Sequence, residues 1–161
     1  MDKFNKIYEM HKKIHQDALA KVLNKNKVKH SMRVVSHLDK LPKHVKIAAI
    51  YHDFIENGGD ENWLYNNVNS ESIKLIRHLS IEDGSTPLEH LKSVISSIED
   101  EDEKNFVILI KIADRLDNFK KRIRKNELSE KYRKKTKKLL EFLIFNYTGN
   151  KKILKRLLKK F

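Results

Sequence analysis

Residues that interrupt helices are scarce in this chain, which has four glycines and two prolines among its 161 residues. Average usage would place about 11 glycines and about 8 prolines in a chain of this length. A β-sandwich or β-barrel needs frequent tight turns, which these residues supply, so an all-β fold is disfavoured. The length suits one domain, and 39% hydrophobic residues are enough for a folded core. We therefore expect an all-α, single-domain helical bundle.

Apolar residues recur at helical spacing along most of the chain, and this periodicity predicts the helices. The helix after Pro42 is apolar nearly all round, so we expect it in the core, continuing to Asn57 until Gly58 ends it. Residues 62–70 are polar and are predicted as a loop with a turn at residues 63–65. The other predicted helices cover residues 3–23, 27–41, 70–79 and 88–98, one helix that follows the acidic run 99–103, and two basic helices separated by a turn at residues 147–150.

Cysteine is absent, which excludes disulfides, iron–sulfur clusters, cysteine-ligated zinc and a cysteine nucleophile. The first ten residues contain no apolar segment of the kind found in signal peptides. Apolar runs such as residues 106–110 are far shorter than the ~20 residues that a membrane-spanning helix needs. The sequence thus predicts a cytoplasmic protein with no membrane span.

The net charge of +13 is concentrated at one end of the chain. Residues 119–161 contain 17 Lys and Arg against 3 Asp and Glu, whereas residues 1–118 contain 18 against 19. Lysines that alternate with apolar positions are most often the solvated face of helices that pack through their apolar stripe, which is the interpretation we favour. Binding to nucleic acid, to an anionic membrane surface or to an acidic partner is the alternative.

His52 and Asp53 lie at the end of the most apolar predicted helix. Ionisable groups are seldom placed there unless they are paired or bind a metal. If this helix continues, Glu56 lies one turn from His52 and Asn57 one turn from Asp53, so all four polar groups share one strip. A purely structural, hydrogen-bonded core histidine is the alternative.

A second set of polar residues follows the apolar run 106–110. Lys111, Asp114 and Asn118 share one face of the predicted helix, which suggests a ligand carboxylate beside groups that contact phosphate. An ordinary surface pattern of charges is the alternative for this set. His30 lies on the apolar side of its own helix, where a structural histidine is the usual explanation.

Taken together, these residues resemble the HD-domain metal-dependent phosphohydrolases. His30, the His52-Asp53 pair and Asp114 follow the order of that family's metal ligands. The stretch from Lys111 to Asn118 is most similar to the hydrolase domain of RelA/SpoT-type alarmone enzymes and their small stand-alone relatives. The His-Asp-x-x-Glu-Asp motif of those enzymes is matched up to Glu56, and Asn57 stands in place of its last Asp.

The resemblance implies an HD-type domain over residues 1–125, with residues 126–161 as a basic helical extension packed on it. It implies a metal held by His30, His52, Asp53 and Asp114. The mixed nitrogen and oxygen donors suit Mn²⁺, Fe²⁺, Zn²⁺ or similar ions. With the resemblance, Mn²⁺ is the expected ion, and Fe²⁺, Zn²⁺, Co²⁺ or Ni²⁺ are the alternatives. The metal would activate a water molecule for attack on phosphorus.

The remaining residues receive roles around this metal. Glu56 and Asn57 are the expected catalytic residues, with Glu56 orienting or deprotonating the attacking water. Lys111, Arg115 and Asn118 are expected to bind a small-molecule nucleotide substrate through its phosphates. We expect hydrolysis of a nucleotide phosphate or pyrophosphate, with a guanosine tetraphosphate-like alarmone as first candidate. The alternative function is a non-catalytic HD-fold binding module whose basic C-terminal helices engage nucleic acid.

Overall fold

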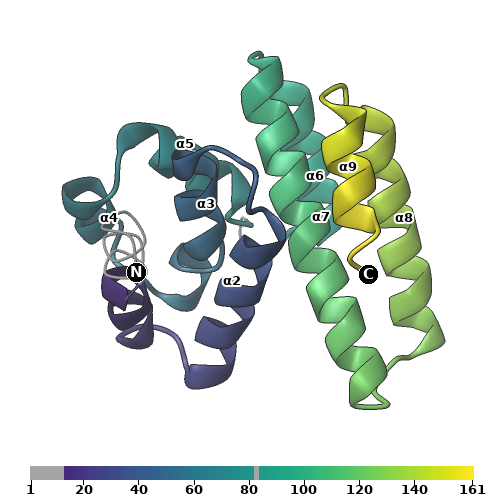
Figure 1. The fold of residues 1–161 in the computed structure, drawn as a ribbon, viewed down its shortest axis with the longest axis horizontal. Coiled ribbons are helices and arrows are strands. Elements are labelled where there is room, and N and C mark those ends of the chain that lie inside the picture. The colour runs from purple at the N-terminus through teal and green to yellow at the C-terminus, as the bar shows by residue number, and fades with distance from the viewer. Residues whose placement is uncertain (1–12, 82–83) are drawn as a thin grey trace, which may run out of the picture.

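The computed structural model describes residues 13–81 and 84–161, and within these ranges the chain contains helices and no strands. The all-α prediction is therefore confirmed. Residues 13–20 are helical and lead into the elements that Figure 1 labels. These elements are α2 (Lys25–His37), α3 (Lys43–Ile50), the 3₁₀ helix η1 (Ile55–Asn57), α4 (Glu61–Asn67), α5 (Ser70–Leu79), α6 (Pro87–Ser97), α7 (Glu101–Arg124), α8 (Glu130–Asn146) and α9 (Lys151–Leu158).

Short polar side chains determine where most of these helices begin. At the start of α6, Thr86 accepts a hydrogen bond from the backbone N–H of Glu89, and the Glu89 side chain binds the backbone N–H of Thr86 in return. Such a capping box satisfies N–H groups that the first helical turn leaves without partners. Single side-chain caps begin six further helices, at Asn24, Asp60, Asn69, Asp100, Ser129 and Asn150.

The prediction that one helix runs from Pro42 to Asn57 is wrong. Helix α3 ends at Ile50, a turn follows, and η1 is a separate 3₁₀ segment that ends at Gly58 with a φ of +83°. The His52 ring turns back to the Ala49 carbonyl, with Nδ1 at 2.8 Å from the oxygen. A continued helix would offer that carbonyl to the N–H of residue 53. The expected alignment of Glu56 and Asn57 on one helical strip is lost.

Other helix boundaries also differ from the predictions. The predicted loop at residues 62–70 contains helix α4, which buries Leu64 to 1% exposure and packs Trp63 on the core. This tertiary burial outweighs the weak helix propensity of its asparagines. The second helix ends at His37 instead of residue 41. Of the predicted helix 3–23, residues 13–20 are helical, residues 21–23 form a turn and residues 3–12 lie outside the described residues.

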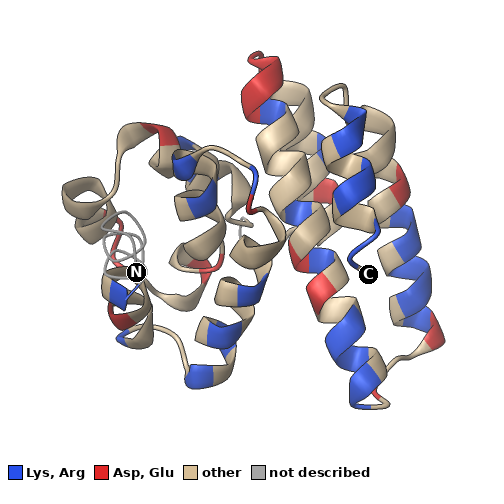
Figure 2. Ribbon diagram, viewed as in Figure 1, with Lys and Arg blue, Asp and Glu red and all other residues tan. Residues whose placement is uncertain are grey.

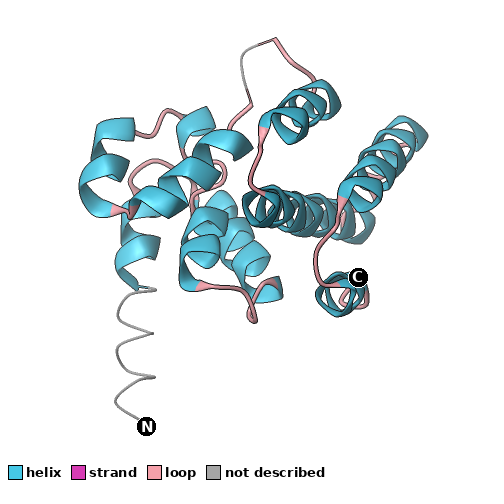
Figure 3. Ribbon diagram, turned by 90° about the horizontal axis from the view of Figure 1, so that it is seen from above, coloured by secondary structure: helices cyan, strands magenta, loops and turns pink. Residues whose placement is uncertain are grey.

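Helix α7 connects the two sides of the molecule. In Figures 1 and 3, α2 to α5 gather on one side of it and α6, α8 and α9 on the other. Helix α7 contacts α2, α3, α5 and α8, and its residues 107–113 are all buried. One hydrophobic cluster extends through both sides of the molecule.

The basic C-terminal helices pack through their apolar residues. Leu139, Leu143 and Leu157 are buried in the same cluster as the rest of the core. Figure 2 shows Lys and Arg along α8 and α9, and most of these lysines are exposed. This arrangement is the one expected for a solvated basic face over a core-packing stripe. No helix in the described ranges is long and apolar enough to cross a membrane.

We predict that Leu157→Ala lowers the free energy of unfolding by about 2–5 kcal/mol, since it removes a large buried side chain and leaves a cavity. Lys152→Ala, on the exposed side of the same helix, should change it by less than about 0.5 kcal/mol. Urea denaturation of both variants measures the difference. Equal stability of the two variants would show that α9 is not part of the cooperative core.

Candidate metal centre

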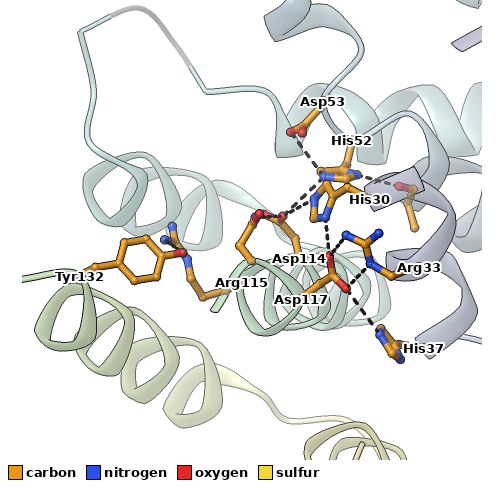
Figure 4. A network of polar contacts seen from close by, with 11 residues as sticks. His30, Arg33, His37, His52, Asp53, Asp114, Arg115, Asp117 and Tyr132 are labelled. Carbon is orange, nitrogen blue, oxygen red and sulfur yellow. Dashed lines mark hydrogen bonds and ion pairs between the residues drawn. The ribbon is translucent and has the colours of Figure 1, made fainter. Parts of the chain in front are cut away.

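Three residues from distant parts of the chain meet in the interior. His30 projects from α2, His52 from the turn after α3 and Asp114 from the middle of α7 (Figure 4). One ligand atom from each lies within 4.8 Å of the other two. The His30 Nε2 atom is 3.0 Å from Asp114 Oδ1, and the His52 Nε2 atom is 3.6 Å from the same oxygen. The structure therefore places two imidazoles and a carboxylate where they could hold one metal ion.

The hydrogen bonds of His52 leave one ring nitrogen available. A backbone carbonyl only accepts, so Nδ1 must donate its proton to the Ala49 oxygen. The other nitrogen, Nε2, is buried and has no hydrogen-bond partner among the described residues. It lies 3.4 Å from Asp53 Oδ1 as well as 3.6 Å from Asp114 Oδ1. A buried nitrogen facing two carboxylates without a hydrogen bond fits a metal ligand.

His30 is oriented by a partner that the sequence analysis did not identify. Its Nδ1 atom is 2.7 Å from Oδ2 of Asp117, which is only 2% exposed. Arg33 holds the same carboxylate with two hydrogen bonds of 2.9 Å, from Nε to Oδ1 and from Nη2 to Oδ2. A carboxylate that holds one nitrogen of a histidine leaves the other free to face Asp114, and Asp117 would orient His30 in this way if a metal were bound.

Helical spacing was the signal that could have found these two residues. Asp117 follows Asp114 by three positions on α7, and Arg33 follows His30 by three on α2. Each pair therefore shares a helix face. The pairing between the two helices, across 87 residues, is visible only in the structure.

The electrostatics of the cluster call for positive charge beside its carboxylates. Burial opposes a charge on His30, but its contacts with Asp114 and Asp117 raise its pKa to about 9. Burial also opposes ionisation of Asp114, but His30 and His52 hold the pKa of that carboxyl well below its usual range. The pKa of Asp117 is likewise lowered by His30 and Arg33, against the effect of burial. Two ionised carboxylates in the interior require positive charge nearby, which protons or a metal ion supply.

A pocket of about 120 Å³ adjoins this cluster. Lys111 is 94% buried there, and its ammonium group has no hydrogen bond or ion pair with any described residue. Arg115 extends toward Tyr132 of α8, with Nη1 at 3.4 Å from the tyrosine oxygen (Figure 4). The pocket is lined by Asp53, Glu56, Ile81, Pro87, Leu91, Lys111, Asp114, Arg115, Asn118 and Leu139.

The predicted site residues take different places around the pocket. Asp53 lines its wall and contacts His52, but it lies outside the three-residue group whose ligand atoms are mutually close. The Glu56 carboxylate accepts a hydrogen bond from the backbone N–H of Ile81 at 2.8 Å. Asn118 donates to Oδ1 of Asp114 at 2.8 Å, so it orients this carboxylate in addition to lining the pocket.

Asn57 is placed differently from the other predicted site residues. Its side-chain nitrogen donates to the Asp53 carbonyl at 2.6 Å, and its side-chain oxygen accepts from Lys27. It does not line the pocket. Both ends of the amide are thus used in holding the turn that carries Asp53.

A scan against protein-family models and searches of curated proteins and of solved structures found no match to this chain. Any function proposed for this chain therefore depends on the geometry of the cluster and on the residue pattern.

We predict that Asp117→Asn weakens Mn²⁺ binding by about 10–100-fold, because the amide no longer provides the anionic partner of His30. Asp102→Asn, an exposed change on the same helix, should leave the affinity unchanged. Titration calorimetry measures both, and thermal unfolding shows whether each variant is folded. Unchanged affinity in the folded Asp117→Asn protein would remove Asp117 from the metal centre.

The metal-free protein should lose stability as the pH rises from about 7 to about 10. A histidine whose pKa is raised from 6.5 to about 9 stabilises the fold fully below pH 6.5, and this stabilisation is lost as the pH passes about 9. Urea denaturation at several pH values, after removal of metals, measures the slope. The slope should be shallower in His30→Gln. An identical slope in both proteins would contradict a raised pKa of His30 in the folded protein.

Proposed function

We propose that this protein is a metal-dependent phosphohydrolase of the HD type that acts on a nucleotide phosphate or pyrophosphate. The observation that carries the proposal is the convergence of His30, His52 and Asp114 beside a pocket that also contains Lys111 and Arg115. A bound divalent ion would supply a nucleophile from water near neutral pH and polarise a phosphoryl oxygen.

The residues around the pocket have complementary roles in this proposal. Lys111 and Arg115 place two cationic groups in the pocket wall, where they neutralise charge on a phosphate group as it is transferred. The aromatic ring of Tyr132 lies 5.7 Å from the Arg115 guanidinium carbon and limits where that group can move. Asn118 keeps the Asp114 carboxylate directed toward the histidines.

Glu56 is the general base in this proposal. Its carboxylate reaches the pocket wall from η1, and the Ile81 N–H occupies only one of its oxygens. A carboxylate has several acceptor positions, so Glu56 can still accept the proton of a water molecule in the pocket. This position differs from the expected helical strip, and the proposal assigns Glu56 the same role there.

The size and lining of the pocket indicate which part of a substrate enters. Its volume of about 120 Å³ is below the ~300 Å³ of pockets that enclose drug-sized ligands, which suits a phosphate or pyrophosphate group and leaves a nucleoside outside. None of the described lining residues is aromatic. A guanosine tetraphosphate-like alarmone, with a terminal pyrophosphate to insert, remains the first candidate substrate.

A nucleotide panel tests the proposed activity. Purified protein is incubated with Mn²⁺ and guanosine tetraphosphate, guanosine triphosphate or a nucleoside monophosphate, and the products are separated by chromatography. We expect Mn²⁺-dependent release of phosphate or pyrophosphate from at least one compound. His52→Gln should lose both the metal and the turnover. Tight Mn²⁺ binding without hydrolysis of any compound would contradict the enzymatic proposal.

We predict that Glu56→Gln keeps Mn²⁺ affinity but lowers kcat by about 10²–10⁴-fold, since proton transfer by a positioned group contributes that much. Glu99→Gln, an exposed change before α7, is the matched control and should behave as the wild type. Calorimetry and steady-state kinetics on the same preparations separate binding from turnover. Near-normal turnover in Glu56→Gln would exclude Glu56 as the base.

A further inference from the structure

A second concavity, of about 250 Å³, lies between the beginning of α2 and the end of α7. It shares no lining residue with the pocket beside Asp114. Figure 2 shows Lys and Arg on both of these helix ends. The lining residues, which we call the basic groove, are Asn26, Lys29, Arg33, Lys121, Arg124 and Lys125.

The positive charges of the basic groove are largely uncompensated. Five of its six lining residues are cationic and none is acidic. In the described part of the chain, only Arg33 among them has a carboxylate partner, which is Asp117. Like charges that converge on one concavity repel one another and focus a positive potential inside it. The arrangement adds little to the stability of the fold and favours an anionic ligand.

Arg33 provides donors that are already oriented. Asp117 occupies the Nε–H and one Nη2–H of its guanidinium, through two hydrogen bonds of 2.9 Å. A guanidinium has five N–H donors, so three are left. The Arg33 side chain is 37% exposed, and it lines the groove. A planar donor group held from behind is well suited to a phosphate, because little side-chain entropy is lost on binding.

We propose that the basic groove binds a chain of linked phosphate groups, as carried by a nucleoside polyphosphate or by inorganic polyphosphate. Such a chain concentrates several negative charges in a small volume and matches five cations that line one concavity. Nucleic acid distributes its phosphates along an extended backbone and is met by a stripe of basic residues. The confined groove therefore favours the compact ligand.

Calorimetry with sodium tripolyphosphate and the metal-free, full-length protein tests this proposal without reference to hydrolysis. The groove variant is Lys29→Ala with Lys121→Ala. The control variant is Lys151→Ala with Lys152→Ala, which removes the same charge from the exposed start of α9. We expect the groove variant to bind at least tenfold more weakly, since hydrogen bonds to charged groups contribute about tenfold or more each. The control variant should bind as the wild type does.

Two further measurements complete the test. Tighter binding of guanosine triphosphate than of tripolyphosphate identifies a nucleotide ligand, and equal binding identifies the phosphate chain alone; either result supports the groove. Equal losses in both variants, no binding by the wild type, or tighter binding of a single-stranded oligonucleotide would overturn the proposal. Because the substitutions relieve repulsion, the groove variant should unfold at or above the wild-type temperature, which keeps a loss of binding interpretable.

Discussion

The Asp114 carboxylate directly follows the fully buried stretch 107–113 of α7 and needs positive charge around it. An ionised group in the interior is costly unless it is paired and hydrogen-bonded. His30 and His52 supply that environment from two other segments, and Asn118 adds a hydrogen bond from the same helix. The chain between Lys25 and Asp53 is thus tied to α7 by polar contacts as well as by apolar packing.

The network of hydrogen bonds extends from the candidate metal centre to Arg33. Asp117 joins His30 to Arg33, so the ligand face of α2 and the basic groove share one carboxylate. This contact explains how one arginine can line a solvent-accessible groove while its guanidinium remains fixed. One short chain of hydrogen bonds runs from Arg33 through Asp117 and His30 to Asp114. The basic groove lies at its Arg33 end, and the pocket that contains Lys111 lies at its Asp114 end.

The charged residues of α7 are distributed unevenly along its length. Its acidic beginning, Glu101 to Glu103, suits the positive end of the helix dipole, and its basic end, Lys121 to Arg124, suits the negative end. Between them, the helix carries the Asp114 and Asp117 carboxylates inward, and the exposed lysines of α8 and α9 lie on the side of α7 that is opposite to α2 to α5.

Local patterns were enough to predict the helical class, most helix starts and three residues, His30, His52 and Asp114, whose ligand atoms lie within 4.8 Å of one another. These features are local, because capping side chains and 3.6-residue periodicity act within a few positions, and His30, His52 and Asp114 are unusual among apolar neighbours. The end of α3 at Ile50 depends on the packing of the whole fold, which buries the His52 ring against the Ala49 carbonyl. The same packing makes the α4 segment helical, sets Asp117 against His30 and leaves Asn57 outside the lining of the pocket. Each of these outcomes depends on burial or on contacts that local sequence patterns do not encode, such as the His30–Asp117 pair across 87 residues.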